Sequence, residues 1–189
     1  MNPRYLGDSY DIVKQSLLRV LAAEGSWATH PMFTDPVSPE RLSCYRRLLG
    51  TPILSDEVLT SGVDRDAYLA PARDGREHVF LDPDTGIRLR STRGKKAPQY
   101  IFGSELMEIA KVRQGRLTLV YDQSLARGAE GQQLQNKLSW FTTEDVYGVA
   151  YVSHACFVLL GTDRSMVKGA FELLKKETGL PEYRFLEAL

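Results

Sequence analysis

The segment that decides the fold class of this chain is Glu77-His78-Val79-Phe80-Leu81-Asp82-Pro83-Asp84-Thr85-Gly86. An apolar run typical of a buried strand ends abruptly at two carboxylates, which are followed by a turn. In an open α/β sheet, ligands bind in the crevice outside the carboxyl ends of the strands. We therefore expect Asp82 and Asp84 to face a ligand. The alternative is an Asp/Pro/Gly turn whose carboxylates only hydrogen-bond backbone amides.

Helical and strand patterns alternate on both sides of this segment. Apolar spacing and capping residues predict helices over residues 10–23, 39–49, 103–112, 130–140 and 164–176, with a helical turn or loop over 64–72. Strands are predicted over residues 27–33, 77–81, 116–121, 146–152 and 156–160. The pattern indicates right-handed βαβ crossovers. We predict one α/β domain over residues 1–189, a three-layer Rossmann-like fold whose mostly parallel sheet ends in a C-terminal antiparallel hairpin.

The composition is that of an ordinary globular protein. The 189 residues are 43% apolar and 25% charged, and 24 basic residues balance 24 acidic ones. This balance argues against a surface devoted to polyanions, although a local basic patch remains compatible with it. No apolar run approaches the roughly 18 residues of a membrane span, and the first residues lack an apolar signal core. We expect a cytoplasmic protein without membrane contact, with Cys44 and Cys156 as buried free thiols.

Acidic residues follow several of the predicted strands. Asp35 follows the first strand, Asp82 and Asp84 follow the central one, and Asp122 follows the next. Because parallel strands end on the same side of a sheet, these carboxylates are expected to converge. Carboxylate oxygens are preferred ligands of Mg²⁺ and Mn²⁺. We predict that Asp82, Asp84 and Asp122 bind such a metal and act in catalysis, and that Asp35, with Asp8 at the start of the first helix, contributes to cofactor binding.

A basic loop comes directly after the central acidic strand end. It contains Arg88, Arg90, Arg93, Lys95 and Lys96. Lys95 and Lys96 are predicted to contact phosphate in the catalytic site. A metal-binding carboxylate cluster beside phosphate-binding cations indicates a metal-dependent phosphodiesterase or nuclease that acts on nucleic acid or nucleotide. The alternative is a solvated loop without a ligand.

Other motifs indicate less. Asp84-Thr85-Gly86 resembles the aspartic-protease motif, and Asp82-x-Asp84-Thr85 resembles that of haloacid-dehalogenase phosphatases, but neither stands in its usual context here. The chain contains no Gly-x-x-x-x-Gly-Lys-Ser/Thr loop and no Gly-x-Ser-x-Gly elbow. The three histidines form no ligand set. The sequence makes no prediction of oligomeric state.

Three short islands carry a family resemblance. They are Tyr5-Leu6-Gly7-Asp8-Ser9-Tyr10-Asp11-Ile12-Val13-Lys14, Val79 to Gly86, and Leu119-Val120-Tyr121-Asp122-Gln123. Together they look like a family of uncharacterised bacterial and phage proteins that pair a GD-x-x-D-x-x-K start with a DPD-N/T-G strand end. This resemblance implies no known activity.

A more distant similarity is to Rossmann-fold methyltransferases that act on adenine in RNA or DNA. Asp82-Pro83 matches the first half of their Asp-Pro-Pro-Tyr motif, which binds the target amino group, whereas Asp84 and Thr85 depart from its second half. The segment Phe33-Thr34-Asp35-Pro36 lacks the glycines that let S-adenosylmethionine approach the backbone. The similarity implies the fold, and it implies an S-adenosylmethionine-dependent or degenerate nucleic-acid methyltransferase as an alternative function. A non-enzymatic binding module is the third alternative.

Overall fold

A computed structural model describes all residues from 1 to 189 and contains six α-helices. The helices are α1 (Ser9–Leu21), α2 (Pro39–Leu49), α3 (Arg65–Asp74), α4 (Gly103–Val112), α5 (Glu130–Thr142) and α6 (Arg164–Thr178). The predicted helices are therefore confirmed, and the ambiguous segment 64–72 belongs to a helix.

Local capping chemistry explains where these helices begin and end. At the start of α2 the Ser38 hydroxyl accepts a hydrogen bond from the Arg41 amide at 3.3 Å, and Pro39 takes the first helical position. Gly50 ends α2 in a left-handed conformation with φ of 71°. At the start of α3 the Asp64 carboxylate caps the Asp66 amide. The sequence thus specifies both ends of α2 and the start of α3 locally.

The main sheet has six strands in the order β1-β2-β5-β7-β6-β8. Its strands are β1 (Trp27–His30), β2 (His78–Leu81), β5 (Thr118–Asp122), β6 (Tyr147–Tyr151), β7 (Cys156–Gly161) and β8 (Phe185–Ala188). β1, β2 and β5 run parallel, whereas β7 runs antiparallel to both β5 and β6, and β8 runs antiparallel to β6. A separate parallel pair joins β3 (Gly86–Arg88) to β4 (Tyr100–Phe102).

The sheet differs from the prediction in two respects. It is mixed rather than mostly parallel, because three of its five pairings are antiparallel. The β6–β7 hairpin is also not the edge of the sheet, since β7 lies between β5 and β6 and β8 covers the far side of β6. The sequence of β8, Phe185-Leu186-Glu187-Ala188, neither alternates apolar with polar residues nor forms a continuous apolar run, so it carries no strand pattern. β1 ends at His30 because Pro31 has no amide proton and Met32 has a φ of 48°.

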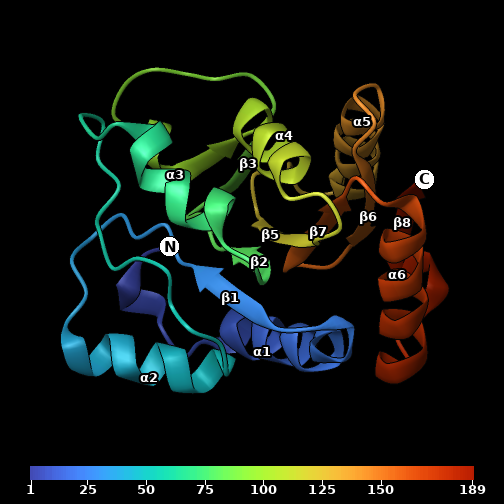
Figure 1. The fold of residues 1–189 in the computed structure, drawn as a ribbon, viewed down its shortest axis with the longest axis horizontal. Helices are drawn as coiled ribbons and strands as arrows, with labels where there is room; N and C mark the ends of the chain where they lie inside the picture. Colours follow the sequence, from blue (N-terminus) through green and yellow to red (C-terminus); the bar gives the residue numbers. More distant parts are fainter.

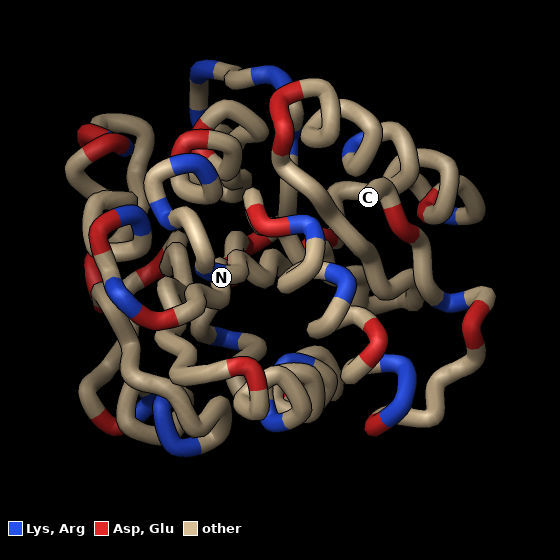
Figure 2. Tube along the Cα trace, turned by 45° about the vertical axis from the view of Figure 1, so that its right-hand side comes forward, with Lys and Arg blue, Asp and Glu red and all other residues tan.

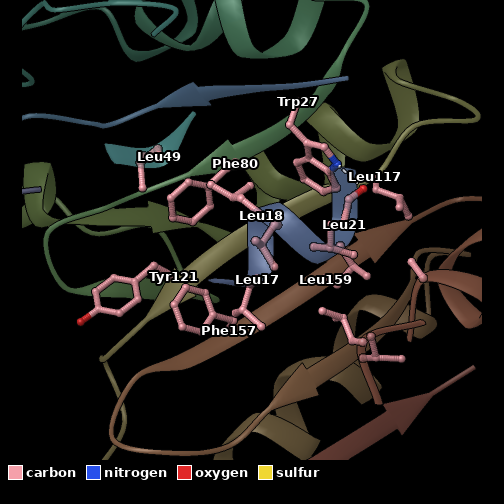
Figure 3. Close-up of a cluster of buried hydrophobic side chains, with 14 of the residues drawn as sticks. Leu17, Leu18, Leu21, Trp27, Leu49, Phe80, Leu117, Tyr121, Phe157 and Leu159 are labelled. Carbon is pink, nitrogen blue, oxygen red and sulfur yellow. Dashed lines mark hydrogen bonds between the residues drawn. The ribbon is translucent and has the colours of Figure 1, made fainter. Parts of the chain in front are cut away.

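Helices cover both faces of the sheet (Figure 1). α1, α2 and α6 contribute to one apolar cluster, and α3, α4 and α5 contribute to the other. Phe80 and Tyr121 belong to the first cluster, whereas their strand neighbours Leu81 and Val120 belong to the second. Figure 3 shows the first cluster, in which the Tyr121 hydroxyl points away from the leucine and phenylalanine side chains. Because side chains alternate along a strand, this pattern determines on which face of the sheet each side chain at a strand end lies.

Charges of both signs are spread along the whole chain (Figure 2). No helix combines the length and the apolar character that crossing a membrane requires. Cys156 is buried as expected, but Cys44 is exposed on α2, so the prediction of two buried thiols is wrong for Cys44.

Candidate functional site

A pocket of about 380 Å³ lies at the carboxyl ends of β2 and β5, beside the beginning of α1. Its lining combines carboxylates, tyrosines and one lysine. The lining residues are Met1, Asn2, Tyr5, Asp8, Tyr10, Asp11, Lys14, Asp82, Pro83, Asp84, Tyr121 and Gln123. The pocket therefore occupies the place where an open α/β sheet binds its ligand.

Asp82 is the most deeply placed carboxylate of this pocket, with no exposed surface. Its Oδ2 accepts hydrogen bonds from Lys14 Nζ at 2.9 Å and from the Tyr45 hydroxyl at 2.5 Å. Its Oδ1 is buried and has no hydrogen-bond donor. Because a buried acceptor without a donor costs about 1–3 kcal/mol, this oxygen marks an incomplete arrangement.

Lys14 holds the Asp82 side chain from α1. Its Nζ also donates to Asp11 Oδ1 at 2.8 Å and lies 4.6 Å from the centre of the Tyr121 ring. Burial lowers the pKa of Lys14, but the charges of Asp82 and Asp11 and their hydrogen bonds outweigh burial and raise it. Lys14 is thus a permanent ammonium ion at neutral pH, and it keeps one Asp82 oxygen occupied.

The remaining partners complete the polar wall around Asp82. Burial, followed by the charge of Asp82, raises the pKa of Tyr45 well above 10, so its hydroxyl is a neutral donor. Burial also raises the pKa of Asp11, against the opposing effect of Lys14. Asp8 caps α1 by accepting from the Tyr10 amide at 2.9 Å. Lys14 and Tyr45 thus fix Asp82 Oδ2, whereas Oδ1 stays free.

Asp122 does not join this pocket, although the sequence predicts that it converges with Asp82. It follows Tyr121 on β5 and therefore faces the opposite side of the sheet, where Lys137 of α5 donates to its Oδ2 at 2.5 Å. Its Oδ1 accepts from the Ile87 amide at 3.0 Å, the Ser124 amide at 3.0 Å and the Ser124 hydroxyl at 2.7 Å. Both oxygens are satisfied, so Asp122 is a structural clamp.

Only part of the predicted site comes together. Asp8, Asp82 and Asp84 line one pocket, whereas the half-buried Asp35 is not among its lining residues. Lys95 and Lys96 are exposed on the loop after β3 and do not line it either. The prediction that these residues converge is wrong because it considered only the strand ends. It did not consider the two faces of the sheet or the length of the basic loop.

Sequence reasoning missed the two residues that hold Asp82 Oδ2. Lys14 belongs to the GD-x-x-D-x-x-K island, and its spacing from Asp11 places both on one face of α1, so the motif contained a usable signal. Tyr45 comes from the interior of α2, 37 residues from Asp82, and nothing in its local sequence distinguishes it from a core tyrosine.

Comparison with known proteins adds no relative. No family model, no curated protein and no solved structure matches this chain. The resemblances stated from the sequence therefore stay predictions, and function has to be argued from the pocket itself.

The pocket offers oxygen atoms to a metal, but not in a ready arrangement. No group of three or more His, Cys, Asp or Glu side chains is placed to hold an ion. A Mg²⁺ or Mn²⁺ ion would rely on Asp82 Oδ1 with Asp84 and Asp8, and it would meet repulsion from the Lys14 ammonium, which lies 2.9 Å from Asp82 Oδ2.

The chain after β1 does not fit S-adenosylmethionine. The amino group of Met1 donates to the carbonyl oxygens of Pro31 at 3.1 Å, Met32 at 2.6 Å and Asp82 at 3.1 Å. Met1 is itself only 5% exposed. It thus covers the backbone after β1, where a methyl donor would need a glycine-rich approach.

Proposed function

We propose that this chain is a base-recognition module for nucleotides or nucleic acid, in which Asp82 accepts a hydrogen bond from the amino group of a nucleobase. The observation that carries the proposal is Asp82 Oδ1, a fully buried acceptor without a donor in the lining of a pocket. Carboxylates accept hydrogen bonds from base amino groups such as N4 of cytosine. A base can reach this buried oxygen only if lining side chains shift, and the half-buried Tyr10 and Asp84 are among them.

The rest of the pocket supports a base better than a phosphate group. Four carboxylates line it, from Asp8, Asp11, Asp82 and Asp84, against the single ammonium side chain of Lys14. This excess of negative charge repels a phosphate but attracts an amino donor. Tyr10 and Tyr121 add aromatic surface against which a base can pack.

The scaffold agrees with the distant methyltransferase similarity only in part. That similarity implies a Rossmann-like sheet with one reversed strand near its end, whereas both β7 and β8 run opposite to β1, β2 and β5 here. Asp82-Pro83 follows β2, in the interior of the sheet. Because this is analogy at the level of fold, it supports the place of the site and not a chemical reaction.

Matched nucleosides test the proposal directly. Calorimetric titration should detect binding of cytidine or adenosine, and each should bind about tenfold more tightly than uridine or inosine, which carry a carbonyl in place of the amino group. Asp122→Asn, on the other face of the sheet, is the control and should keep this preference. Equal affinities within both nucleoside pairs, or no binding of any nucleoside, would contradict the proposal.

A metal-dependent phosphodiesterase or nuclease is the second candidate. It is favoured by the shared pocket of Asp8, Asp82 and Asp84 and is opposed by the adjacent Lys14 ammonium. It predicts that Mn²⁺ raises the melting temperature through binding to the folded state and that an oligonucleotide is cleaved only when the metal is present. Asp84→Asn should abolish both effects. Cleavage that persists with excess chelator would exclude this candidate.

A further inference from the structure

The rim of the pocket carries an aromatic side chain that the fold does not use. Tyr5 lines the pocket and is 68% exposed, which makes it one of the most exposed large apolar residues of the molecule. It stands at the end of the short 3-10 helix Pro3–Tyr5, whose first residue is a buried proline. The Asn2 side chain caps this turn through the Arg4 amide at 3.0 Å. Tyr5 is therefore displayed on a constrained backbone rather than on a free end.

Two arginines lie beside the Tyr5 turn, although neither lines the pocket itself. Arg4 precedes it on the same turn, and Arg41 of α2 reaches the turn by donating to the Pro3 carbonyl oxygen at 3.4 Å. Both residues are exposed. Neither guanidinium forms an ion pair with a carboxylate. The acidic pocket thus has a rim with uncompensated positive charge beside an exposed aromatic ring.

We infer that the rim formed by Arg4, Tyr5 and Arg41, called here the Tyr5 rim, is a second subsite for the neighbouring nucleotide of a single-stranded oligonucleotide. This inference rests on the proposed base pocket. A base that enters the pocket leaves its phosphate outside, because the carboxylates repel it. The rim arginines then neutralise that phosphate, and the next base stacks on Tyr5.

The arrangement selects a single strand over a free nucleoside or a duplex. A nucleoside has no phosphate for the arginines and no second base to stack on Tyr5. In a duplex, bases are paired and stacked, so one base must be extruded before it can reach Asp82. A single strand offers an accessible base, a phosphate and a second base together, one for each part of the site.

The test compares one nucleoside with one oligonucleotide of the same base. The affinity for a labelled oligocytidine of eight nucleotides, called C8, is measured by fluorescence anisotropy, and the affinity for cytidine is measured by calorimetry. C8 should bind at least about tenfold more tightly than cytidine. Tyr5→Ala should weaken C8 binding about tenfold and cytidine binding much less, so that the preference for C8 over cytidine falls. Arg41→Ala should weaken C8 binding and reduce the slope of log affinity against log salt by about 0.7.

The chain offers a matched control for the tyrosine. Tyr183 is 76% exposed and also has an arginine beside it, with the Arg184 guanidinium 5.2 Å from the ring centre, but it does not line the pocket. Tyr183→Ala should leave C8 binding unchanged. Equal C8 affinity for wild type and Tyr5→Ala, or C8 and cytidine binding equally, would overturn the Tyr5 rim while leaving the base pocket intact. If cytidine does not bind at all, the base pocket itself fails and the rim fails with it.

Discussion

The molecule contains two buried aspartate–lysine pairs of the same chemistry on opposite faces of one sheet. On the α5 face, Asp122 accepts four hydrogen bonds, and Lys137 donates to the Ile87 carbonyl oxygen and the Ser124 hydroxyl as well. On the α1 face, Lys14 and Tyr45 occupy one oxygen of Asp82, and the other has no donor. Burial and ion pairing alone thus do not mark a site, whereas an unsatisfied acceptor beside a pocket does.

The closed pair has a structural task. It joins α5 and β3 to the chain after β5 through Lys137, Ile87 and Ser124. β3 approaches so closely that a Cβ on Gly86 would lie 2.2 Å from Asp122 Oδ1. In the open pair, Asp82 and Lys14, no hydrogen-bond donor contacts the free oxygen, Asp82 Oδ1.

Removal of the closed carboxylate should have the largest effect. Asp122→Ala leaves the Lys137 ammonium with neutral acceptors only and removes the acceptor of the Ile87 and Ser124 amides, so it should lower the free energy of unfolding by about 4 kcal/mol. Asp82→Ala should cost less, because Lys14 keeps Asp11 as a partner at 2.8 Å. Urea unfolding of both variants measures the difference. Equal losses would show that the two pairs do not differ in structural weight.

His30 on β1 tests whether an unpartnered buried atom always signals a ligand. Its Nδ1 has no partner, but His30 does not line the pocket. Burial lowers the pKa of His30 from 6.5 to about 4. Since the unfolded chain binds this proton first, the free energy of unfolding should fall by about 3 kcal/mol as the pH drops from 6.5 to 4.

The variant His30→Gln cannot titrate, so its free energy of unfolding should depend less on pH in that window while its cytidine affinity stays at the wild-type value. Urea unfolding at half-unit pH steps measures the slope, with His154→Gln as the exposed control. If His30→Gln leaves the pH dependence of the free energy of unfolding unchanged, the lowered pKa of His30 is contradicted. A loss of cytidine affinity would show that the pocket extends to β1.

Gly86 probes how tightly the closed pair is packed. Gly86 and Gly94 both have positive φ, 135° and 105°, but a Cβ on Gly94 meets no atom within 4 Å. Gly94→Ala therefore reports backbone strain alone, of about 1 kcal/mol. Gly86→Ala adds the clash with Asp122 and should cost about 2 kcal/mol more. Thermal unfolding of the two variants gives this difference, and equal melting temperatures would mean that the clamp can yield.

Local chemistry allowed the sequence to predict much of the fold. Ser38, Pro39 and Gly50 specify both ends of α2, and the apolar run before Asp82 specifies β2. The sequence does not predict β8, because Phe185-Leu186-Glu187-Ala188 neither alternates apolar with polar residues nor forms a continuous apolar run, and its pairing with β6 depends on the folded sheet. The mixed direction of the sheet likewise comes from the insertion of β7 between β5 and β6, which no local pattern encodes.

The candidate site was predictable only where it depends on strand ends. Asp82 and Asp84 follow β2 and do line the pocket, but Asp122 was misplaced because a strand end says nothing about the face of the sheet. Alternation along Leu119, Val120 and Tyr121 contains that information once one member is known to face α1. Tyr45 could not be found at all, since its contact with Asp82 joins α2 to the end of β2.

The smallest expected effect is the sharpest test of the open pair. In Asp82→Asn, Lys14 and Tyr45 still donate to one oxygen, so the amide oxygen must take the Oδ2 position and the amide nitrogen must take the position of the free Oδ1. A donor then faces the pocket instead of an acceptor. Cytidine affinity should fall about tenfold and uridine affinity should rise, which inverts the wild-type preference. Calorimetric titration of both nucleosides measures the ratio of their affinities, and the melting temperature confirms that the variant is folded.

The control variant Asp122→Asn should not invert the preference, because both oxygens of Asp122 are occupied within the clamp. A ratio that moves equally in the two variants would mean that the free oxygen of Asp82 does not read the base.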